Sequence, residues 1–283
     1  MKIGLVLEGG ACRSVFSAGV LDALMDAGIK ADYVIGVSAG ACYMASYCSG
    51  QRGRNYKIMK EYIPDKRYMG VRYLLNPENR SYFNLNFVYN EIVNELVPFD
   101  YEALEDFPGR IVAVVTNIES GNAEYIDVPR NDKKSVLLRA SCALPILFPP
   151  IKFKGQYYMD GGIVDPIPIE HTLAAGCDKV IVIVTRDRNY IKMPEPGLEF
   201  GKRKYRRYQE FVRSLDERTM RYNGALSRMK KREKEGKAFV IAPKDSSRYK
   251  RIERDSMELT SWYMDGFNIA NERLDELKAF LEG

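Results

Sequence analysis

One serine lies in a context that could make it a nucleophile. In the run Gly-Val-Ser-Ala-Gly, Ser38 has Gly36 and Gly40 two positions away on either side. A serine on a sharp turn between a strand and a helix adopts a strained backbone that exposes its hydroxyl, and tiny neighbours prevent collision with the turn. An apolar run at 33–37 precedes Ser38 and small residues at 39–49 follow it. This context predicts a nucleophilic serine, because the five-residue motif alone is weak.

A glycine-rich turn follows the first apolar run of the chain, at 2–7. It consists of Gly9, Gly10, Ala11, Cys12 and Arg13. Small residues let successive backbone N–H groups point into a cavity, where the start of a following helix adds positive potential. Such a turn can stabilise an oxyanion with the help of the Ala39 N–H, which follows the candidate nucleophile. An ordinary tight turn is an equally good interpretation of these residues alone. A phosphate-binding loop is disfavoured, because no Gly-Lys-Ser/Thr follows.

Histidine, a common partner of a catalytic serine, occurs once, at His171. A Ser-His-Asp triad must therefore use His171 or do without histidine. His171 lies at the predicted start of a helix, where a solvated position is favoured over a catalytic one. A single histidine also argues against a histidine-rich metal site, and we expect neither a metal nor a cofactor.

An aspartate is the other candidate partner. Asp160, Gly161 and Gly162 follow the apolar segment 157–159. Asp-Gly-Gly by itself is most often only a turn, so these residues alone leave the role of the aspartate open.

Four motifs occur in the order seen in patatin-like phospholipases, and the chain most resembles the bacterial branch of that family. They are GGxxR at 9–13, GVSAG at 36–40, ASCALPILFPP at 140–150 and DGG at 160–162. The resemblance covers about residues 2–185. It implies a mostly parallel sheet flanked by helices, in a modified α/β-hydrolase architecture. It also implies Ser38 as nucleophile, Asp160 as base and the 9–13 turn as oxyanion hole.

The glycine-rich turn departs from the family's frequent G-x-G-x-x-G pattern, because Ala11 and Ser14 occupy the third and sixth positions. A methyl group at Ala11 is tolerated if its φ is negative, since only its N–H is needed. The Asp-Gly-Gly form is a common variant of Asp-Gly-Ala. Neither departure weakens the dyad prediction.

A Ser-Asp dyad depends on its surroundings. A free aspartate has a pKa near ~3.9 and is a poor acceptor for a serine proton. Burial would raise its basicity, and a preorganised oxyanion hole would stabilise the developing charge. We expect phospholipase A-like hydrolysis of lipid or other acyl esters through an acyl-Ser38 intermediate. Two alternatives stay open: a catalytically silent membrane-binding or regulatory protein on the same fold, and a thioesterase or acyltransferase using the same dyad.

Apolar runs alternate with helical patterns, which predicts a parallel sheet covered by helices. Strands are predicted at 2–7, 33–37, 111–116, 124–128, 157–159, 180–184 and 239–242. Helices are predicted at 14–27, 39–49, 85–96, 133–141 and, in large part, 257–281. We expect a catalytic domain at 1–190 and a basic, mainly helical region at 191–283 that packs on it or extends it.

The 283 residues are 46% hydrophobic and 29% charged, which is typical of a soluble globular protein. Five cysteines without CxxC spacing disfavour a disulfide framework and favour a reducing compartment. The sequence has no signal-peptide pattern and no stretch long enough to span a bilayer. These observations predict a cytoplasmic protein, with a peripheral position at the inner membrane face as a variant.

Positive charge is concentrated in one segment, 201–237, which holds fourteen lysines and arginines against five aspartates and glutamates. A solvated helical face is the commonest explanation of such a run. An anionic membrane surface is the second, because each cation contributes about 1 kcal/mol there; Tyr205, Tyr208 and Phe211 would suit such an interface. Nucleic acid is the least favoured partner, because no recognised binding motif accompanies the charge.

Overall fold

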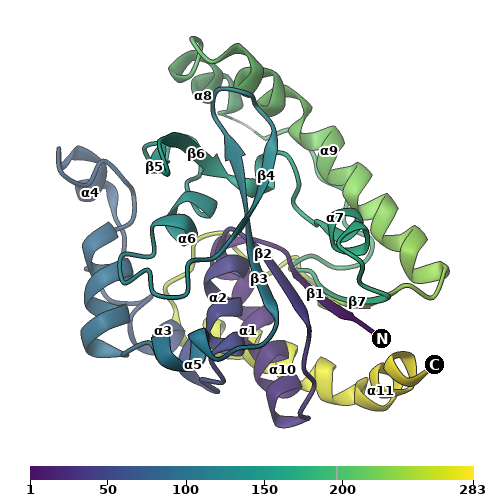
Figure 1. Ribbon diagram of the computed structural model, residues 1–283. Helices are drawn as coiled ribbons and strands as arrows, with labels where there is room; N and C mark the ends of the chain where they lie inside the picture. Colours follow the sequence, from purple (N-terminus) through teal and green to yellow (C-terminus); the bar gives the residue numbers. More distant parts are fainter. Residues whose placement is uncertain (196) are drawn as a thin grey trace.

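The structure is a computed structural model that describes residues 1–195 and 197–283. Its centre is an eight-stranded sheet in the order β5-β6-β3-β2-β1-β7-β8, with β4 paired to β3 outside that path (Figure 1). The strands are β1 (Ile3–Leu7), β2 (Tyr33–Val37), β3 (Arg110–Asn117), β4 (Ala123–Asp127), β5 (Ile151–Phe153), β6 (Gln156–Asp160), β7 (Lys179–Ile183) and β8 (Ala238–Ile241).

Five neighbouring strands, β3, β2, β1, β7 and β8, are parallel. The pairings of β4 and β6 with β3, and of β5 with β6, are antiparallel. The predicted mostly parallel sheet is therefore confirmed. The parallel strands are nearly continuous apolar runs because helices cover both of their faces.

Helices cover both faces of the sheet, so the fold has three layers (Figure 1). One face is covered by α1 (Val15–Asp26), α2 (Ala39–Cys48) and α10 (Ser256–Glu272), and the other by α7 (Ile169–Ala174) and α9 (Gln209–Lys234). Side chains alternate along each strand, so Leu5 and Leu7 pack in the first layer and Val6 packs in the second.

The remaining elements are mostly short. Between β2 and β3 lie α3 (Arg54–Glu61), α4 (Val71–Leu75), the π-helix η2 (Phe87–Leu96) and α5 (Tyr101–Glu105). The others are the 3-10 helices η1 (Ala11–Ser14) and η3 (Gly161–Ile163), together with α6 (Val136–Ser141), α8 (Leu198–Lys204) and α11 (Leu274–Glu282). The helix predicted at 85–96 is thus present, but with π geometry over most of its length.

The C-terminal region contributes to the same sheet and the same helical layer as the N-terminal region. Strand β8 pairs in parallel with β7, and α10 crosses α1 at two glycines. A methyl group added at Gly19 would lie 1.9 Å from the Tyr263 carbonyl oxygen, and one added at Gly266 would lie 2.0 Å from the Phe16 carbonyl oxygen. The two helices can therefore approach this closely only because both residues lack a side chain.

Helical structure over 257–281 is divided in two. Helix α10 ends at Glu272 and α11 begins at Leu274. Arg273 lies between them and donates a hydrogen bond from Nη1 to the Val240 carbonyl oxygen in β8, at 2.6 Å. The Arg273 side chain therefore links the junction between the two helices to the edge strand β8.

The three aromatic residues that would suit a membrane interface under the second explanation of the basic segment 201–237 do not form an exposed surface. Tyr205 and Phe211 are 3% and 0% exposed and belong to the core, and Tyr208 packs against it. They point inward because a surface helix needs an apolar stripe facing the core. Across 1–195 and 197–283, no helix combines the length and the hydropathy needed to cross a membrane.

Candidate active site

Ser38 occupies the turn between β2 and α2, with φ 54° and ψ −128°. Residues other than glycine rarely adopt such a positive φ, and backbone strain of this kind is concentrated at functional sites. Both flanking residues must be glycine, because a side chain at either position would collide with neighbouring backbone atoms. A methyl group at Gly36 would lie 2.5 Å from the Ala41 Cα, and one at Gly40 would lie 2.7 Å from the carbonyl oxygens of Leu7 and Glu8. The spacing of the motif is therefore a packing requirement of this turn.

Ser141 fixes the backbone of the turn, a role that the sequence analysis did not assign. The Ser38 N–H donates to Ser141 Oγ at 2.8 Å, and that hydroxyl donates to the Val114 carbonyl oxygen in β3 at 2.7 Å. Ser141 is fully buried at the end of α6. The only signal for it was its place in the ASCALP run at 140–145.

Asp160 ends β6 and is 2% exposed. Its Oδ1 accepts a hydrogen bond from the Gly162 N–H at 2.8 Å, whereas its Oδ2 has no hydrogen-bond partner among the described residues. A methyl group at Gly161 would lie 2.2 Å from the Val114 carbonyl oxygen, so the chain after Asp160 lies directly against β3. The aspartate is thus held rigidly, with one oxygen left open.

Burial raises the pKa of Asp160, and the Ser38 hydroxyl, the Arg218 guanidinium, the Gly162 N–H and Arg251 partly oppose that rise. The Ser38 hydroxyl therefore lies close enough to favour the carboxylate, although the pair falls outside standard hydrogen-bond geometry. Such pairs are often long in unliganded enzymes and tighten with substrate. The carboxylate is accordingly more basic than a free aspartate and lines the same cavity as Ser38.

The glycine-rich turn lies against Ser38. A methyl group at Gly9 would lie 2.6 Å from the Ser38 Cβ. Among the described residues, no protein acceptor takes the backbone N–H groups of Gly9, Gly10, Ala11 or Ala39. Four donors near the nucleophile are therefore free to meet a negative charge.

Two details of the turn differ from the sequence analysis. Ala11 has φ 51°, so the condition of a negative φ is not met, and the turn accepts an alanine in the left-handed region at some cost in strain. The Arg13 N–H is also taken, because it donates to the Gly10 carbonyl oxygen at 3.2 Å. Arg13 therefore has no free backbone N–H to offer to an oxyanion.

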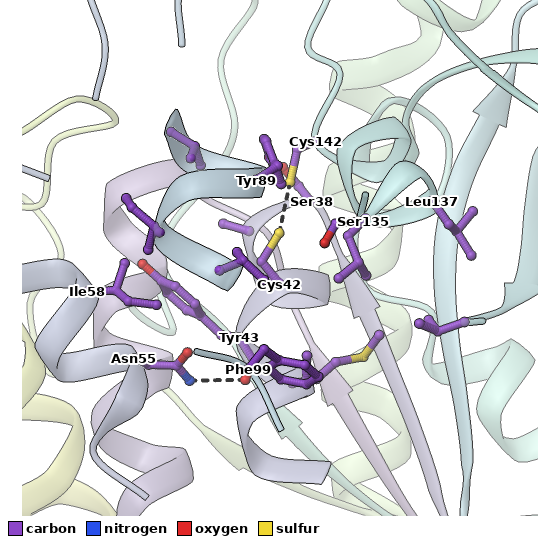
Figure 2. Close-up of a pocket in the computed structure, with 18 of the residues that line it drawn as sticks. Ser38, Cys42, Tyr43, Asn55, Ile58, Tyr89, Phe99, Ser135, Leu137 and Cys142 are labelled. Carbon is purple, nitrogen blue, oxygen red and sulfur yellow. Dashed lines mark hydrogen bonds between the residues drawn. The ribbon is translucent and has the colours of Figure 1, made fainter. Parts of the chain in front are cut away.

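Two cavities meet at Ser38. The first is apolar, has a volume of about 160 Å³, and extends toward α2, α3 and η2. Figure 2 shows Ser38 beside Tyr89 and Cys142, with the Cys42 and Cys142 sulfurs 3.5 Å apart. An engineered apolar cavity of roughly 150 Å³ binds benzene, so this one has room for several methylene groups.

Three tyrosines and one cysteine that line the apolar cavity stay neutral. Burial raises the pKa values of Tyr43, Tyr68 and Tyr89. The Cys42 thiol and burial raise the pKa of Cys142. These four side chains therefore add no charge to the lining, which also includes Arg54, Arg130 and Asp132.

The second cavity is polar. Ser38 and Asp160 line it together with the glycine-rich turn at 9–11 and four cations: Arg13, Lys192, Arg218 and Arg251. Among the described residues, no group of three or more histidine, cysteine, aspartate or glutamate side chains is placed to hold a metal ion.

His171 lines neither cavity. Its ring stacks on Tyr125 at 3.6 Å with an interplanar angle of 8°, and its Nε2 lies 3.0 Å from the Tyr33 hydroxyl. Burial lowers its pKa. His171 is therefore only partly exposed, because these two tyrosines contact its ring.

Two family models match the chain. One is described as "Patatin-like phospholipase" and matches residues 5–173; the other is described as a domain of unknown function (DUF6363) and matches residues 208–282. The match between the first model and the four motifs supports the resemblance seen in the sequence.

Three individual proteins illustrate the similarity. "Lysophospholipase nte1" of Emericella nidulans is 30% identical over 188 residues, which are 64% of this chain and 12% of that protein. The uncharacterized protein YjjU of Escherichia coli is 27% identical over 187 residues, covering 65% of this chain and 52% of that protein. The structure of VipD from Legionella pneumophila aligns with a TM-score of 0.48 and 14% identity, covering 97% of this chain and 67% of that one. The chain thus spans about half of the length of the Escherichia coli protein and 12% of the Emericella nidulans protein.

Proposed function

The chain belongs to the patatin-like phospholipase family, and from that premise we propose that it hydrolyses carboxylic esters of lipids with Ser38 as nucleophile and Asp160 as base. The observation that carries the proposal is the strained serine facing a buried carboxylate with an unoccupied oxygen. A general base must lie within reach of the proton that it removes, and its basicity must suit that task. Asp160 lines the polar cavity together with Ser38 and has a raised pKa, whereas His171 lines neither cavity at Ser38, so Asp160 is the base that we propose.

The reaction follows from this pairing. Asp160 accepts the Ser38 proton while Oγ attacks the acyl carbon, and the proton passes to the leaving alcohol as its C–O bond breaks. A water molecule then gives its proton to Asp160 and attacks the acyl-serine. Ser38 Oγ leaves with that proton, which releases the fatty acid and restores the dyad.

Negative charge develops on the carbonyl oxygen in both steps. The free N–H groups of Gly9, Gly10, Ala11 and Ala39 are the donors that would meet it, and one such donor is typically worth about 10²–10³-fold in kcat. The apolar cavity would take the acyl chain, because most of the side chains that line it are apolar. Relatives named lysophospholipases make single-chain phospholipids the first substrate class to test.

The test combines labelling with turnover. A fluorophosphonate probe should label the wild-type protein and not Ser38→Ala, and a screen of lipid classes should show turnover that Ser38→Ala lowers by roughly 10⁴-fold or more. A mutant that keeps a tenth of wild-type turnover would remove Ser38 from the mechanism. Absence of both labelling and turnover would leave a non-catalytic protein, and a preference for acyl-CoA would favour a thioesterase.

A further inference from the structure

The glycine-rich turn rests on a buried polar cluster that the proposed reaction leaves without a role. Thr185, which follows β7, is fully buried, and its hydroxyl oxygen lies 3.1 Å from the Gly9 carbonyl oxygen. A methyl group added at Gly10 would lie 2.8 Å from the same hydroxyl oxygen. Thr185 lines neither cavity at Ser38, so it contacts the turn without lining the space that a substrate would occupy.

The contact with Thr185 sets the direction of one backbone donor. None of the described peptide bonds is cis, and in a trans unit the C=O and N–H groups point in opposite directions. The Gly9 carbonyl oxygen is placed to accept from the Thr185 hydroxyl, so the Gly10 N–H of the same unit points away from Thr185. Gly10 lines the polar cavity with Ser38, and its N–H has no protein acceptor among the described residues. Thr185 therefore helps to present that N–H to the cavity.

Glu8 and Tyr222 hold Thr185 in place. The Thr185 N–H donates to Glu8 Oε2 at 2.6 Å, and the Thr185 hydroxyl, at 3.1 Å, can donate to this oxygen as well as to Gly9. Glu8 Oε1 accepts a hydrogen bond from the Tyr222 hydroxyl. Burial and the Glu8 carboxylate raise the pKa of Tyr222, so its hydroxyl keeps the proton that it donates. A buried carboxylate needs such partners, and hydrogen bonds to a charged group are the stronger kind.

The cluster joins parts of the chain that are far apart in sequence. Tyr222 is on α9, within the residues 208–282 that the second family model matches, whereas Glu8 lies within the residues 5–173 that the phospholipase model matches. Thr185 lies between the two matched ranges. Helix α9 therefore reaches the glycine-rich turn through a single tyrosine hydroxyl.

We propose that Thr185, Glu8 and Tyr222 are positioning residues that hold the Gly10 N–H where it meets the oxyanion formed at Ser38. The inference rests on the proposed function and deepens it, because it gives α9 a part in the chemical step. Negative charge develops on the acyl oxygen only as the transition state is approached, so a displaced donor lowers kcat more than it weakens substrate binding. A displacement of about 1 Å can lower the rate by about 10²-fold.

The first test removes the Thr185 hydroxyl. Thr185→Val keeps the approximate size and the backbone N–H of this residue, so kcat should fall by about 10- to 100-fold while KM changes little. Thr185→Ser restores a hydroxyl and should recover most of the lost kcat. The matched control is Thr172→Val, which removes a fully buried hydroxyl that donates to the Pro168 carbonyl oxygen at 2.8 Å and should leave kcat unchanged. A change confined to KM, or a fall in kcat that Thr185→Ser fails to reverse, would contradict the positioning role.

The second test removes the link to α9. Tyr222→Phe should lower kcat by about tenfold, and the loss in Thr185→Val/Tyr222→Phe should be smaller than the product of the two single losses, because both residues act on the Glu8 carboxylate. The matched control is Tyr263→Phe, which removes a buried tyrosine hydroxyl that donates to Asp22 Oδ2 at 2.7 Å and should leave kcat unchanged. An equal fall in kcat in Tyr222→Phe and Tyr263→Phe, or no fall in Tyr222→Phe, would overturn the part assigned to α9.

An inhibitor distinguishes failure of this inference from failure of the proposed function. Ser38 Oγ attacks the carbonyl carbon of an alkyl trifluoromethyl ketone, Asp160 takes the hydroxyl proton, and the C=O π electrons move to oxygen, which gives an oxyanion without a leaving group. Its inhibition constant should rise about tenfold or more in Thr185→Val and Tyr222→Phe, because the adduct mimics the transition state. Equal inhibition of the wild type and both variants would overturn the positioning role and leave Ser38 as nucleophile. Absence of both inhibition and turnover in the wild type would overturn the proposed function, and the positioning role with it.

Discussion

Ser38 is held in a conformation that costs on the order of 1–3 kcal/mol, and contacts from distant parts of the chain hold it there. The two motif glycines are local in sequence and were predicted. Ser141 lies 103 residues away, and no periodicity marks a buried serine as the acceptor of one particular N–H. The positive φ of Ala11 was also missed, because the path of the turn is set by packing against Ser38 and not by residue type.

The first prediction at this scale concerns the base. Asp160→Asn should lose most esterase activity because the amide cannot accept the serine proton, whereas His171→Ala should keep it. Burial raises the pKa of Asp160, and only the ionised form is a base. Wild-type kcat/KM should therefore fall on acidification through a pKa above that of a free aspartate. A pH–rate profile for all three proteins measures this, and an inactive histidine variant beside an active asparagine variant would reverse the assignment.

Ser141 provides a prediction about positioning. Ser141→Ala removes the acceptor for the Ser38 N–H, so we expect kcat to fall by about 10- to 100-fold, because small displacements of a reacting group are costly. KM should change little, since Ser141 lines neither cavity. The matched control is Ser17→Ala, which removes a fully buried hydroxyl that has no hydrogen-bond partner among the described residues. Equal losses in both variants, or a change confined to KM, would contradict a positioning role.

At the scale of elements, the sheet was more predictable than its surroundings. Buried parallel strands such as 33–37 and 180–184 are apolar runs that sequence displays directly. Strand β5 and the break at Arg273 were missed. Both depend on partners far along the chain, β6 for the strand and the Val240 carbonyl oxygen for the break.

The crossing of α1 and α10 gives a prediction of stability. Gly266→Ala would place a methyl group 2.0 Å from a backbone oxygen that cannot move freely, so the free energy of unfolding should fall by about 1–3 kcal/mol or more. The control is Gly224→Ala within α9, where the nearest atom is the end of the Arg228 side chain at 3.2 Å. That change should be neutral or slightly stabilising, because alanine favours helix. Thermal unfolding followed by circular dichroism compares the two, and equal melting temperatures would contradict the tight crossing.

At the scale of the whole molecule, the structure divides the positive charge of 201–237 by location. Arg218 faces the polar cavity, and Lys202 pairs with Glu199 and Asp216. Arg203, Lys204, Arg206 and Arg207 are exposed around the end of α8, next to Phe200, which is 63% exposed. The composition gives the number of these charges. It does not show where each charged side chain points, because that depends on how α9 packs on the sheet.

The last prediction is that these four exposed cations dock the protein on anionic lipid. Changing Arg203, Lys204, Arg206 and Arg207 together to Gln should lower co-sedimentation with phosphatidylglycerol vesicles at least tenfold at low salt, because each cation contributes about 1 kcal/mol. Wild-type binding should weaken as salt shortens the Debye length from about 10 Å at 0.1 M, and it should be absent on zwitterionic vesicles. The control changes Lys230, Lys231, Lys234 and Lys237, which are exposed at the other end of α9, and removes the same charge. Equal loss in both variants would mean that only net charge matters, and no loss in the first would leave these residues as a solvated surface.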